Sequence, residues 1–170
     1  MHLPPSPIGF DSSVLINFCA VRRLDVLVAA CSPPRYVLAD VVEELEPGCR
    51  RQVDELLARN DLAVTTLKGR DELERWAGYT LRLDAGEAAT LAAAAVRGWS
   101  IAVDERAARR IAAHDLGANR ITGTVGILRA AVAHDHVTID EGDRFLQRMI
   151  DDGYWSPVES LREESEDSEK

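Results

Sequence analysis

Cysteine, aromatic residues and positive charge are all scarce in this sequence. Its 170 residues include three cysteines and 5% aromatic residues. An odd number of cysteines with no C-x-x-C pair argues against a disulfide framework and a zinc site, so we expect Cys19 and Cys31 to be small buried side chains. Lys and Arg total 20 against 29 Asp and Glu, giving a net charge of −9. A surface that binds nucleic acid by its overall charge is therefore excluded.

Long hydrophobic runs and several common ligand-binding motifs are also missing. No apolar run approaches the roughly 20 residues of a membrane-spanning helix, and the first residues lack the basic and apolar regions of a secretion signal. Neither a phosphate-binding loop, a dinucleotide fingerprint nor a G-x-S-x-G motif is present. These absences predict a cytoplasmic protein with no membrane partner, and they give no support for NAD, ATP or a serine nucleophile.

The pattern of the remaining residues predicts one α/β domain. With 46% apolar residues, a chain of this length can form one sizeable core. Short apolar runs alternate with longer helical patterns, which indicates a parallel sheet covered on both faces. We expect strands at 8–10, 36–38, 62–67, 100–103 and 120–122. The helices are expected at 14–21, 24–30, 41–57 with an interruption at Pro47, 71–81, 88–96, 106–114, 127–133 and 141–152.

Two finer expectations concern a helical face and the end of the chain. In the predicted helix 71–81, Leu73, Trp76 and Ala77 lie on one face, which we expect to pack on the core. Residues 159–170 contain six acids and two bases. We therefore predict a domain over residues 1–157 and a disordered acidic tail over 158–170.

Acidic residues follow several of the predicted strands. Asp11 follows the first strand, Glu43 and Glu44 follow the second, Glu87 opens the alanine-rich helix, and Asp104 follows the fourth strand. Because ligands bind at the carboxyl ends of parallel strands, these acids are expected to converge. Converging carboxylates repel one another unless a divalent cation such as Mg²⁺ or Mn²⁺ neutralises them. Such a cation activates water and supports phosphodiester hydrolysis.

The same acids also fit a purely structural interpretation. Asp is a preferred helix N-cap, so Asp11 and Asp104 can be caps. The spacing of Asp84 and Glu87 is that of a capping box. The positions of the acids alone leave both interpretations open.

Several motifs resemble those of PIN domains. The segment Phe10 to Asn17, with Asp11 followed by Ser-Ser-Val-Leu-Ile, resembles the opening of this family, and Val41 to Leu45 resembles its second acidic motif. Residues 83–91, 103–109, 121–128 and 153–157 look like one branch of PIN-domain proteins related to VapC-type toxins. The segment before Asp11 is richer in proline than the family pattern, which predicts a short first strand.

The resemblance implies a fold, an activity and partners. The fold is a three-layer α/β/α arrangement with about five parallel strands. The activity is that of an Mg²⁺- or Mn²⁺-dependent endoribonuclease, often the toxin of a type II toxin-antitoxin pair. An RNA substrate, an antitoxin protein and a homodimer are the implied partners. The alternative is an inactive PIN-like module that binds or regulates another molecule.

The resemblance also assigns roles to residues. Asp11, Glu44, Glu87 and Asp104 would be the catalytic and metal-binding acids, with Glu43 an alternative to Glu44 and Asp84 an alternative to Glu87. Hydroxyl groups of Ser12, Thr122 and Thr124 would support them.

Other candidate groups follow from spacing. Arg106, Arg109 and Arg110 share one helical face, which predicts either a site for RNA phosphates or an ordinary solvated surface. The three tryptophans, Trp76, Trp99 and Trp155, are scattered and are expected to pack rather than to stack on bases.

Overall fold

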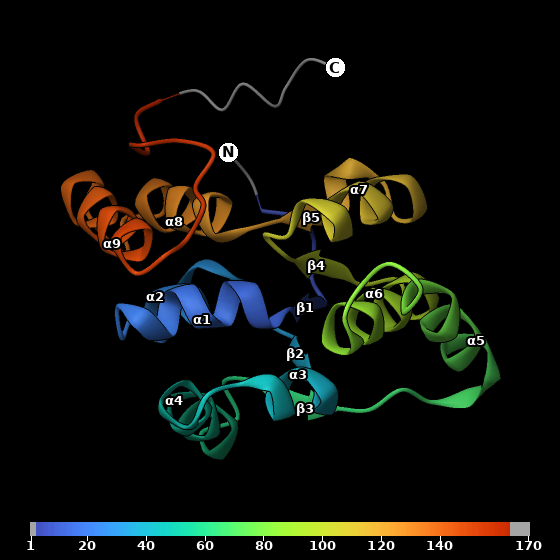
Figure 1. The fold of residues 1–170 in the computed structure, drawn as a ribbon. Helices are drawn as coiled ribbons and strands as arrows, with labels where there is room; N and C mark the ends of the chain where they lie inside the picture. Colours follow the sequence, from blue (N-terminus) through green and yellow to red (C-terminus); the bar gives the residue numbers. More distant parts are fainter. Residues whose placement is uncertain (1–2, 164–170) are drawn as a thin grey trace.

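The centre of the protein is a parallel sheet of five strands. Figure 1 shows the computed structural model, which describes residues 3–163. The strands are β1 (Ile8–Phe10), β2 (Arg35–Leu38), β3 (Ala63–Thr65), β4 (Ser100–Ala102) and β5 (Ile121–Thr122). They are ordered β3-β2-β1-β4-β5, and every neighbouring pair is parallel. The predicted α/β class and parallel sheet are confirmed.

Helices cover both faces of this sheet, so the protein has three layers. One layer holds α1 (Ser12–Ala20), α2 (Leu24–Ala30), α4 (Pro47–Ala58), α8 (Thr124–Ala133) and α9 (Ile139–Asp151). The other holds α5 (Gly69–Tyr79), α6 (Ala85–Arg97) and α7 (Arg106–Asp115). Helix α3 (Ala39–Glu44) follows β2 and packs on α6, and a 3-10 turn spans Ala118–Arg120.

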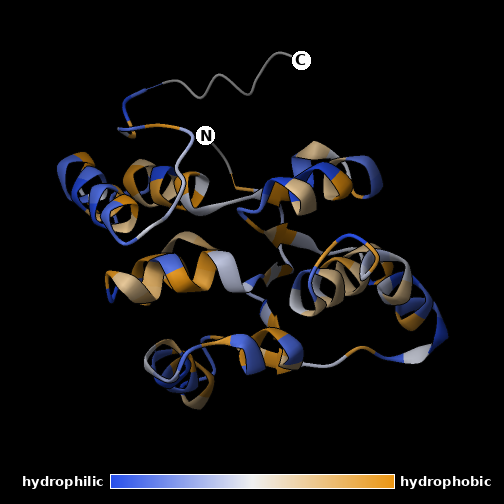
Figure 2. Ribbon diagram, in the orientation of Figure 1, coloured by the Kyte–Doolittle hydropathy of each residue, from blue (hydrophilic) through white to orange (hydrophobic). Residues whose placement is uncertain are grey.

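The core lies between the sheet and these layers. Phe10 is completely buried, and the alanines of α6 are buried on most sides, because small side chains let α6 approach the sheet closely. Gly98 ends α6 in the left-handed conformation, with φ of 74°. In Figure 2 the strands have hydrophobic colours, whereas the outer side of α9 is largely hydrophilic. No helix among residues 3–163 is both long enough and apolar enough to span a membrane.

The buried face of α5 differs from the predicted one. Leu73 is 51% exposed and Ala77 is also exposed, whereas Glu72 is 3% exposed. Arg97, the last residue of α6, donates hydrogen bonds from Nε and Nη2 to the two carboxylate oxygens of Glu72 at 2.6 and 2.8 Å. This bidentate pairing, which lowers the pKa of Glu72, turns the helix so that an ion pair faces α6 in place of Leu73. The predicted face of α5 is therefore wrong for Leu73 and Ala77, whereas Trp76 is half-buried and packs on the core.

The expectation about the cysteines is also wrong in part. Cys19 in α1 and Cys49 in α4 form a disulfide with their Cα atoms 5.3 Å apart. The two are 30 residues apart in the sequence, and only the packing of α1 on α4 brings them together. Cys31 is a buried free thiol, as predicted, and its burial raises its pKa to about 12.

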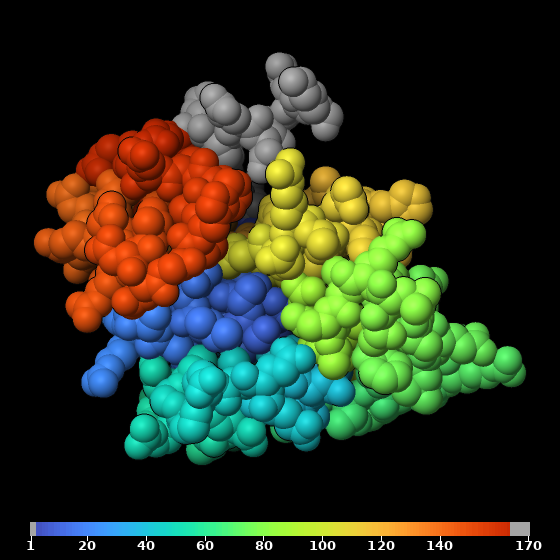
Figure 3. Space-filling model, viewed as in Figure 1, coloured from blue at the N-terminus to red at the C-terminus, as the bar shows by residue number. Residues whose placement is uncertain are grey.

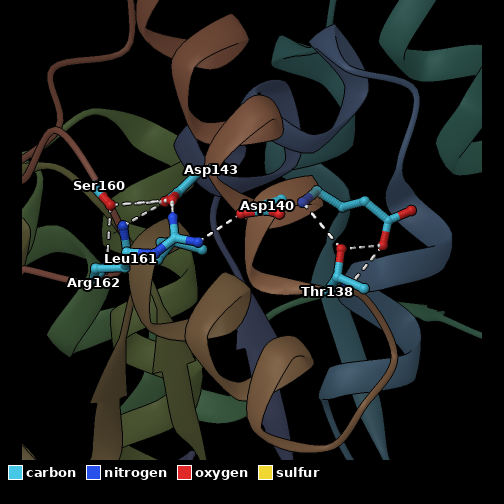
Figure 4. Close-up of polar contacts among 7 residues, drawn as sticks. Thr138, Asp140, Asp143, Ser160, Leu161 and Arg162 are labelled. Atoms are coloured by element: carbon cyan, nitrogen blue, oxygen red, sulfur yellow. Dashed lines mark hydrogen bonds and ion pairs between the residues drawn. The ribbon is translucent and has the colours of Figure 1, made fainter.

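The packed part of the chain extends past Pro157. Val158 and Leu161 are 5% and 6% exposed, which anchors the segment to the core. The Asp143 carboxylate in α9 accepts a hydrogen bond from the backbone N–H of Leu161 at 2.7 Å and pairs with Arg162, as Figure 4 shows. The first part of the predicted tail, residues 158–163, is therefore held against the domain through Val158 and Leu161. Residues 164–170 of the predicted tail lie outside the described residues.

Candidate active site

The sheet order places two of the predicted acids at the point where the strand order reverses. From β1 the chain builds outward to β2 and β3, then returns to the other side of β1 with β4 and β5. Asp11 directly follows β1, and Asp104 lies just past β4. The two acids therefore flank the switch point, where open α/β sheets bind ligands. Figure 3 shows the start of α1 in the middle of one face, where it meets α3, α6 and the segment leading to α7.

Asp11 is the N-cap of α1 and uses only one of its two carboxylate oxygens for this role. Its Oδ2 accepts hydrogen bonds from the backbone N–H and the hydroxyl of Ser13, at 3.0 and 2.6 Å. The other oxygen, Oδ1, is buried and has no hydrogen-bond partner within residues 3–163. Burial of this side chain, which is 1% exposed, raises its pKa. A buried carboxylate oxygen without a hydrogen-bond partner is rare, and it indicates that this oxygen binds a ligand.

Ser13 connects Asp11 to the end of the neighbouring strand. Its Oγ accepts a hydrogen bond from the backbone N–H of Asp104 at 3.1 Å while donating to Asp11. The sequence reasoning selected Ser12 and missed Ser13. The signal was available, since a serine two residues after an Asp cap commonly bonds to it.

Asp104 has hydrogen-bond partners on both oxygens. Thr124 donates from its backbone N–H to Oδ1 at 2.9 Å and from its hydroxyl to Oδ2 at 2.5 Å. Asn17 donates to Oδ2 at 3.0 Å, and Tyr154 donates to Oδ1 at 3.3 Å. Burial and the nearby Asp104 charge raise the pKa of Tyr154, which keeps it a donor. This carboxylate is held in one orientation.

The two predicted threonines differ in position. Thr124 contacts Asp104 as described. Thr122 is buried, its hydroxyl lies against Gly126, and its backbone carbonyl accepts from the N–H of Val103 at 3.0 Å. Of the two threonines, Thr124 therefore supplies the hydroxyl that bonds to Asp104. Asn17 and Tyr154 also bond to Asp104, and the sequence reasoning missed both.

Glu44 reaches the start of α6. Its Oε1 accepts a hydrogen bond from the backbone N–H of Gly86 at 2.8 Å, and the Ser12 side chain also bonds to it. A Cβ at position 86 would lie 2.5 Å from Oε2 of Glu44, so any larger residue there would displace the Glu44 carboxylate from this position. Burial first, then the charges of Asp84 and Asp11, raise the pKa of Glu44. Glu43 and Glu44 are both exposed, so it is the hydrogen bond from Gly86 at the start of α6 that favours Glu44 over Glu43.

Glu87 and Asp84 have different positions at the same helix end. Oδ1 of Asp84 accepts from the backbone N–H of Glu87 at 2.8 Å, so Asp84 is the N-cap of α6. The Glu87 side chain is 8% exposed. Burial, followed by the charges of Asp11 and Asp84, raises its pKa to about 7. The geometry gives Asp84 the capping role and leaves Glu87 as the buried acid.

The acids form a cluster with little compensating charge. Asp11, Glu44 and Glu87 each have a raised pKa, and no basic side chain is among the main influences on these three values. A set of carboxylate oxygens, one of which is the Asp11 oxygen without a hydrogen-bond partner, suits a hard divalent cation. Within residues 3–163, however, no three carboxylate, thiol or imidazole groups are arranged closely enough to hold an ion as they lie.

The three arginines of α7 do not act as one face. Nη1 of Arg109 donates to the backbone carbonyls of Val103 and Thr122, at 2.9 and 3.0 Å, and so ties the ends of β4 and β5 together. These bonds engage one end of the Arg109 guanidinium, and its contact with RNA phosphates stays a prediction. Arg106 and Arg110 are exposed.

The tryptophans also differ from one another. Trp99 is buried and stacks on Tyr36 with ring centroids 4.3 Å apart, and Trp76 is half-buried. Trp155 is 78% exposed, so the expectation that its side chain packs is wrong.

Together, the sheet order, the helical layers and the buried acids define a doubly wound α/β protein with an acidic site at its switch point. The family of PIN domains matches residues 8–167, and the chain belongs to this family. PIN domains are generally nucleases, and they typically use divalent metal ions. Comparisons with curated proteins and with solved structures give no match.

Proposed function

We propose that this protein is a metal-dependent endoribonuclease that hydrolyses RNA phosphodiester bonds. The observation that carries the proposal is the group of acids at the switch point of a PIN domain, in which Asp11 and Glu87 are buried. Asp11, Glu44 and Glu87 have raised pKa values, and one Asp11 oxygen has no partner within residues 3–163. A cation is the simplest ligand that relieves both conditions.

The proposed roles follow from the contacts. Asp11, Glu44, Glu87 and Asp104 would hold Mg²⁺ or Mn²⁺, which when bound lowers the pKa of water and neutralises phosphate oxygens. Asn17, Thr124 and Tyr154 fix the orientation of Asp104. Ser13 couples Asp104 to Asp11.

The biological context is a further part of the proposal. The resemblance of the motifs to VapC-type toxins supports a role as the toxin of a type II toxin-antitoxin pair in the cytoplasm. An antitoxin protein would restrain the nuclease, and the protein would form a homodimer. A small protein that is encoded beside this one and that blocks its cleavage of RNA would support this role.

One other function has support from specific contacts. Asp11 and Asp84 are helix caps, and the acids as they lie are not close enough to hold an ion. Both facts suit an inactive PIN module that binds or regulates another molecule.

Metal binding and RNA cleavage by an Asp11→Asn variant separate the two functions. The asparagine oxygen can still cap α1, so the fold should persist, as circular dichroism will check. For the nuclease, calorimetry should show Mn²⁺ binding to the wild type and a strong loss in the variant, together with loss of RNA cleavage. Asp54→Asn, a surface change in α4, is the matched control. No Mn²⁺ binding and no cleavage by the wild type would favour the inactive module.

A further inference from the structure

A groove lies between α5 and α7. Its volume is about 600 Å³, and it is lined by the last turns of α5, the loop that leads to α6, and the outer face of α7. Tyr79, Leu81 and Ile111 contribute its apolar surface. Leu81, in the turn after α5, is 84% exposed, so the groove presents apolar surface to the solvent.

The charge of the groove is positive, although the chain as a whole is acidic. Arg75, Arg82 and Arg110 line it, with Asp115 as the acid among its lining residues. Asp115 is already engaged, because it accepts a hydrogen bond from Tyr79 at 2.6 Å and contacts His114 at 2.6 Å.

Two of the three arginines have no acidic partner. Arg75 interacts with Tyr79 and Asp115. For Arg82 and Arg110, no carboxylate of the described part of the chain lies within ion-pair distance. Two guanidinium groups without partners in one groove indicate an anionic ligand, since guanidinium pairs well with phosphate.

The arginines of the groove lie close along the chain to the residues of the acidic site. Arg82 lies two residues before Asp84, which caps α6 beside Glu87. Arg110 lies about 6 Å along the axis from Arg106, the first residue of α7, at 1.5 Å per residue. That helix begins two residues after Asp104. A polymer lying across the acids would therefore meet this groove within a few nucleotides.

We propose that the groove binds the single-stranded RNA substrate on one side of the phosphate that is cut. Arg82 and Arg110 bind two backbone phosphates, and Tyr79 and Leu81 offer apolar surface to a ribose or a base. This inference rests on the proposed function, because it assigns part of the same substrate. The two unpaired arginines suit the regularly repeated phosphates of RNA. A second copy of this chain would bring its acidic segment 159–170 instead, and sedimentation tests that alternative below.

Binding of RNA without catalysis is the direct test. The probe is a fluorescein-labelled, single-stranded RNA of 12 nucleotides and mixed sequence, added to the full chain in EDTA and followed by anisotropy. The variant Arg82→Ala/Arg110→Ala should bind at least tenfold more weakly than wild type. The slope of log affinity against log salt should fall by about 1.4, or about 0.7 for each lost phosphate contact on a single strand.

A second double variant controls for charge alone. Arg51→Ala/Arg59→Ala removes the same charge from α4 and its C-cap residue, in the opposite helical layer, and should bind RNA within twofold of wild type. Equal losses in both double variants, or none in the first, would overturn the inference.

Further outcomes distinguish a failure of the groove hypothesis from a failure of the proposed function. Cleavage by the wild type in Mn²⁺, with unchanged binding and cleavage in Arg82→Ala/Arg110→Ala, would reject the groove and leave the nuclease standing. A wild type that neither binds nor cleaves RNA would reject both. If sedimentation shows that the variant loses self-association but keeps RNA binding, the groove is a protein contact and the inference is wrong.

Discussion

Replacing Glu87 by glutamine should stabilise the metal-free protein at neutral and alkaline pH. The Glu87 carboxyl is buried, and burial together with Asp11 and Asp84 raises its pKa to about 7. Between pH 4.5 and 7 the folded protein therefore holds a proton that the unfolded chain has released. Because the folded state binds more protons, stability falls as the pH rises through this window. Glutamine has nearly the same shape and never ionises.

The size of this effect follows from the pKa values. A change from 4.5 to about 7 is roughly 2.5 units, and at 1.36 kcal/mol per unit it corresponds to an upper limit of about 3 kcal/mol. The cost is fully present above pH 7 and absent below pH 4.5. Asp11 and Glu44 also have raised pKa values, so the wild type should lose further stability with rising pH in the same direction.

Urea unfolding in EDTA at pH 4.5 and pH 8 measures the prediction. We expect Glu87→Gln and the wild type to be equally stable at pH 4.5, and the variant to be more stable by about 2 to 3 kcal/mol at pH 8. Glu43→Gln, at an exposed position, is the control and should change little. A Glu87→Gln variant no more stable than wild type at pH 8 would refute the reasoning. Added Mn²⁺ should stabilise the wild type more than the variant.

Three other predictions concern the site and its scaffold. Gly86→Ala should push the Glu44 carboxylate away, because the new Cβ would lie 2.5 Å from Oε2; calorimetry should show at least tenfold weaker Mn²⁺ binding, and an unchanged affinity would exclude Glu44 as a ligand. Asp84→Ala should destabilise the protein by about 1 kcal/mol relative to Asp84→Asn, which removes the same charge but keeps the cap; equal urea midpoints for the two would argue against capping. Reducing the disulfide between Cys19 and Cys49 should cost about 3 to 4 kcal/mol, given a closed loop of about 30 residues, and a thiol assay that counts three free thiols in the unreduced protein would contradict it.

The sequence was informative about the centre of the sheet because β1 and β4 are buried along their whole length. Such strands are continuous apolar runs, and each run ends where the chain leaves the core. The residue after the first run is Asp11, so the same feature that defined the strand also located the first acid. The acid beyond β4 was found in the same way.

Features that depend on packing between distant segments were not predictable in this way. The orientation of α5 is set by the pairing of Glu72 with Arg97, which are 25 residues apart. Hydrophobicity alone predicted that Leu73 would be buried, because it takes no account of an ion pair that turns the helix. The disulfide and the packing of Leu161 depend equally on contacts across the fold.

The competing interpretations of the acids, helix cap or metal ligand, are compatible in the structure because a carboxylate has two oxygens. In Asp11, Oδ2 caps α1 through Ser13, and Oδ1 remains buried without a partner in the described part of the chain. The local spacing reveals the first role, since Ser13 is only two residues away. The second depends on Glu44 and Glu87, which the sheet and α6 bring near from 33 and 76 residues along the chain. A capping motif at a strand end is therefore no argument against a ligand, and the oxygen that the cap leaves free is the one to test.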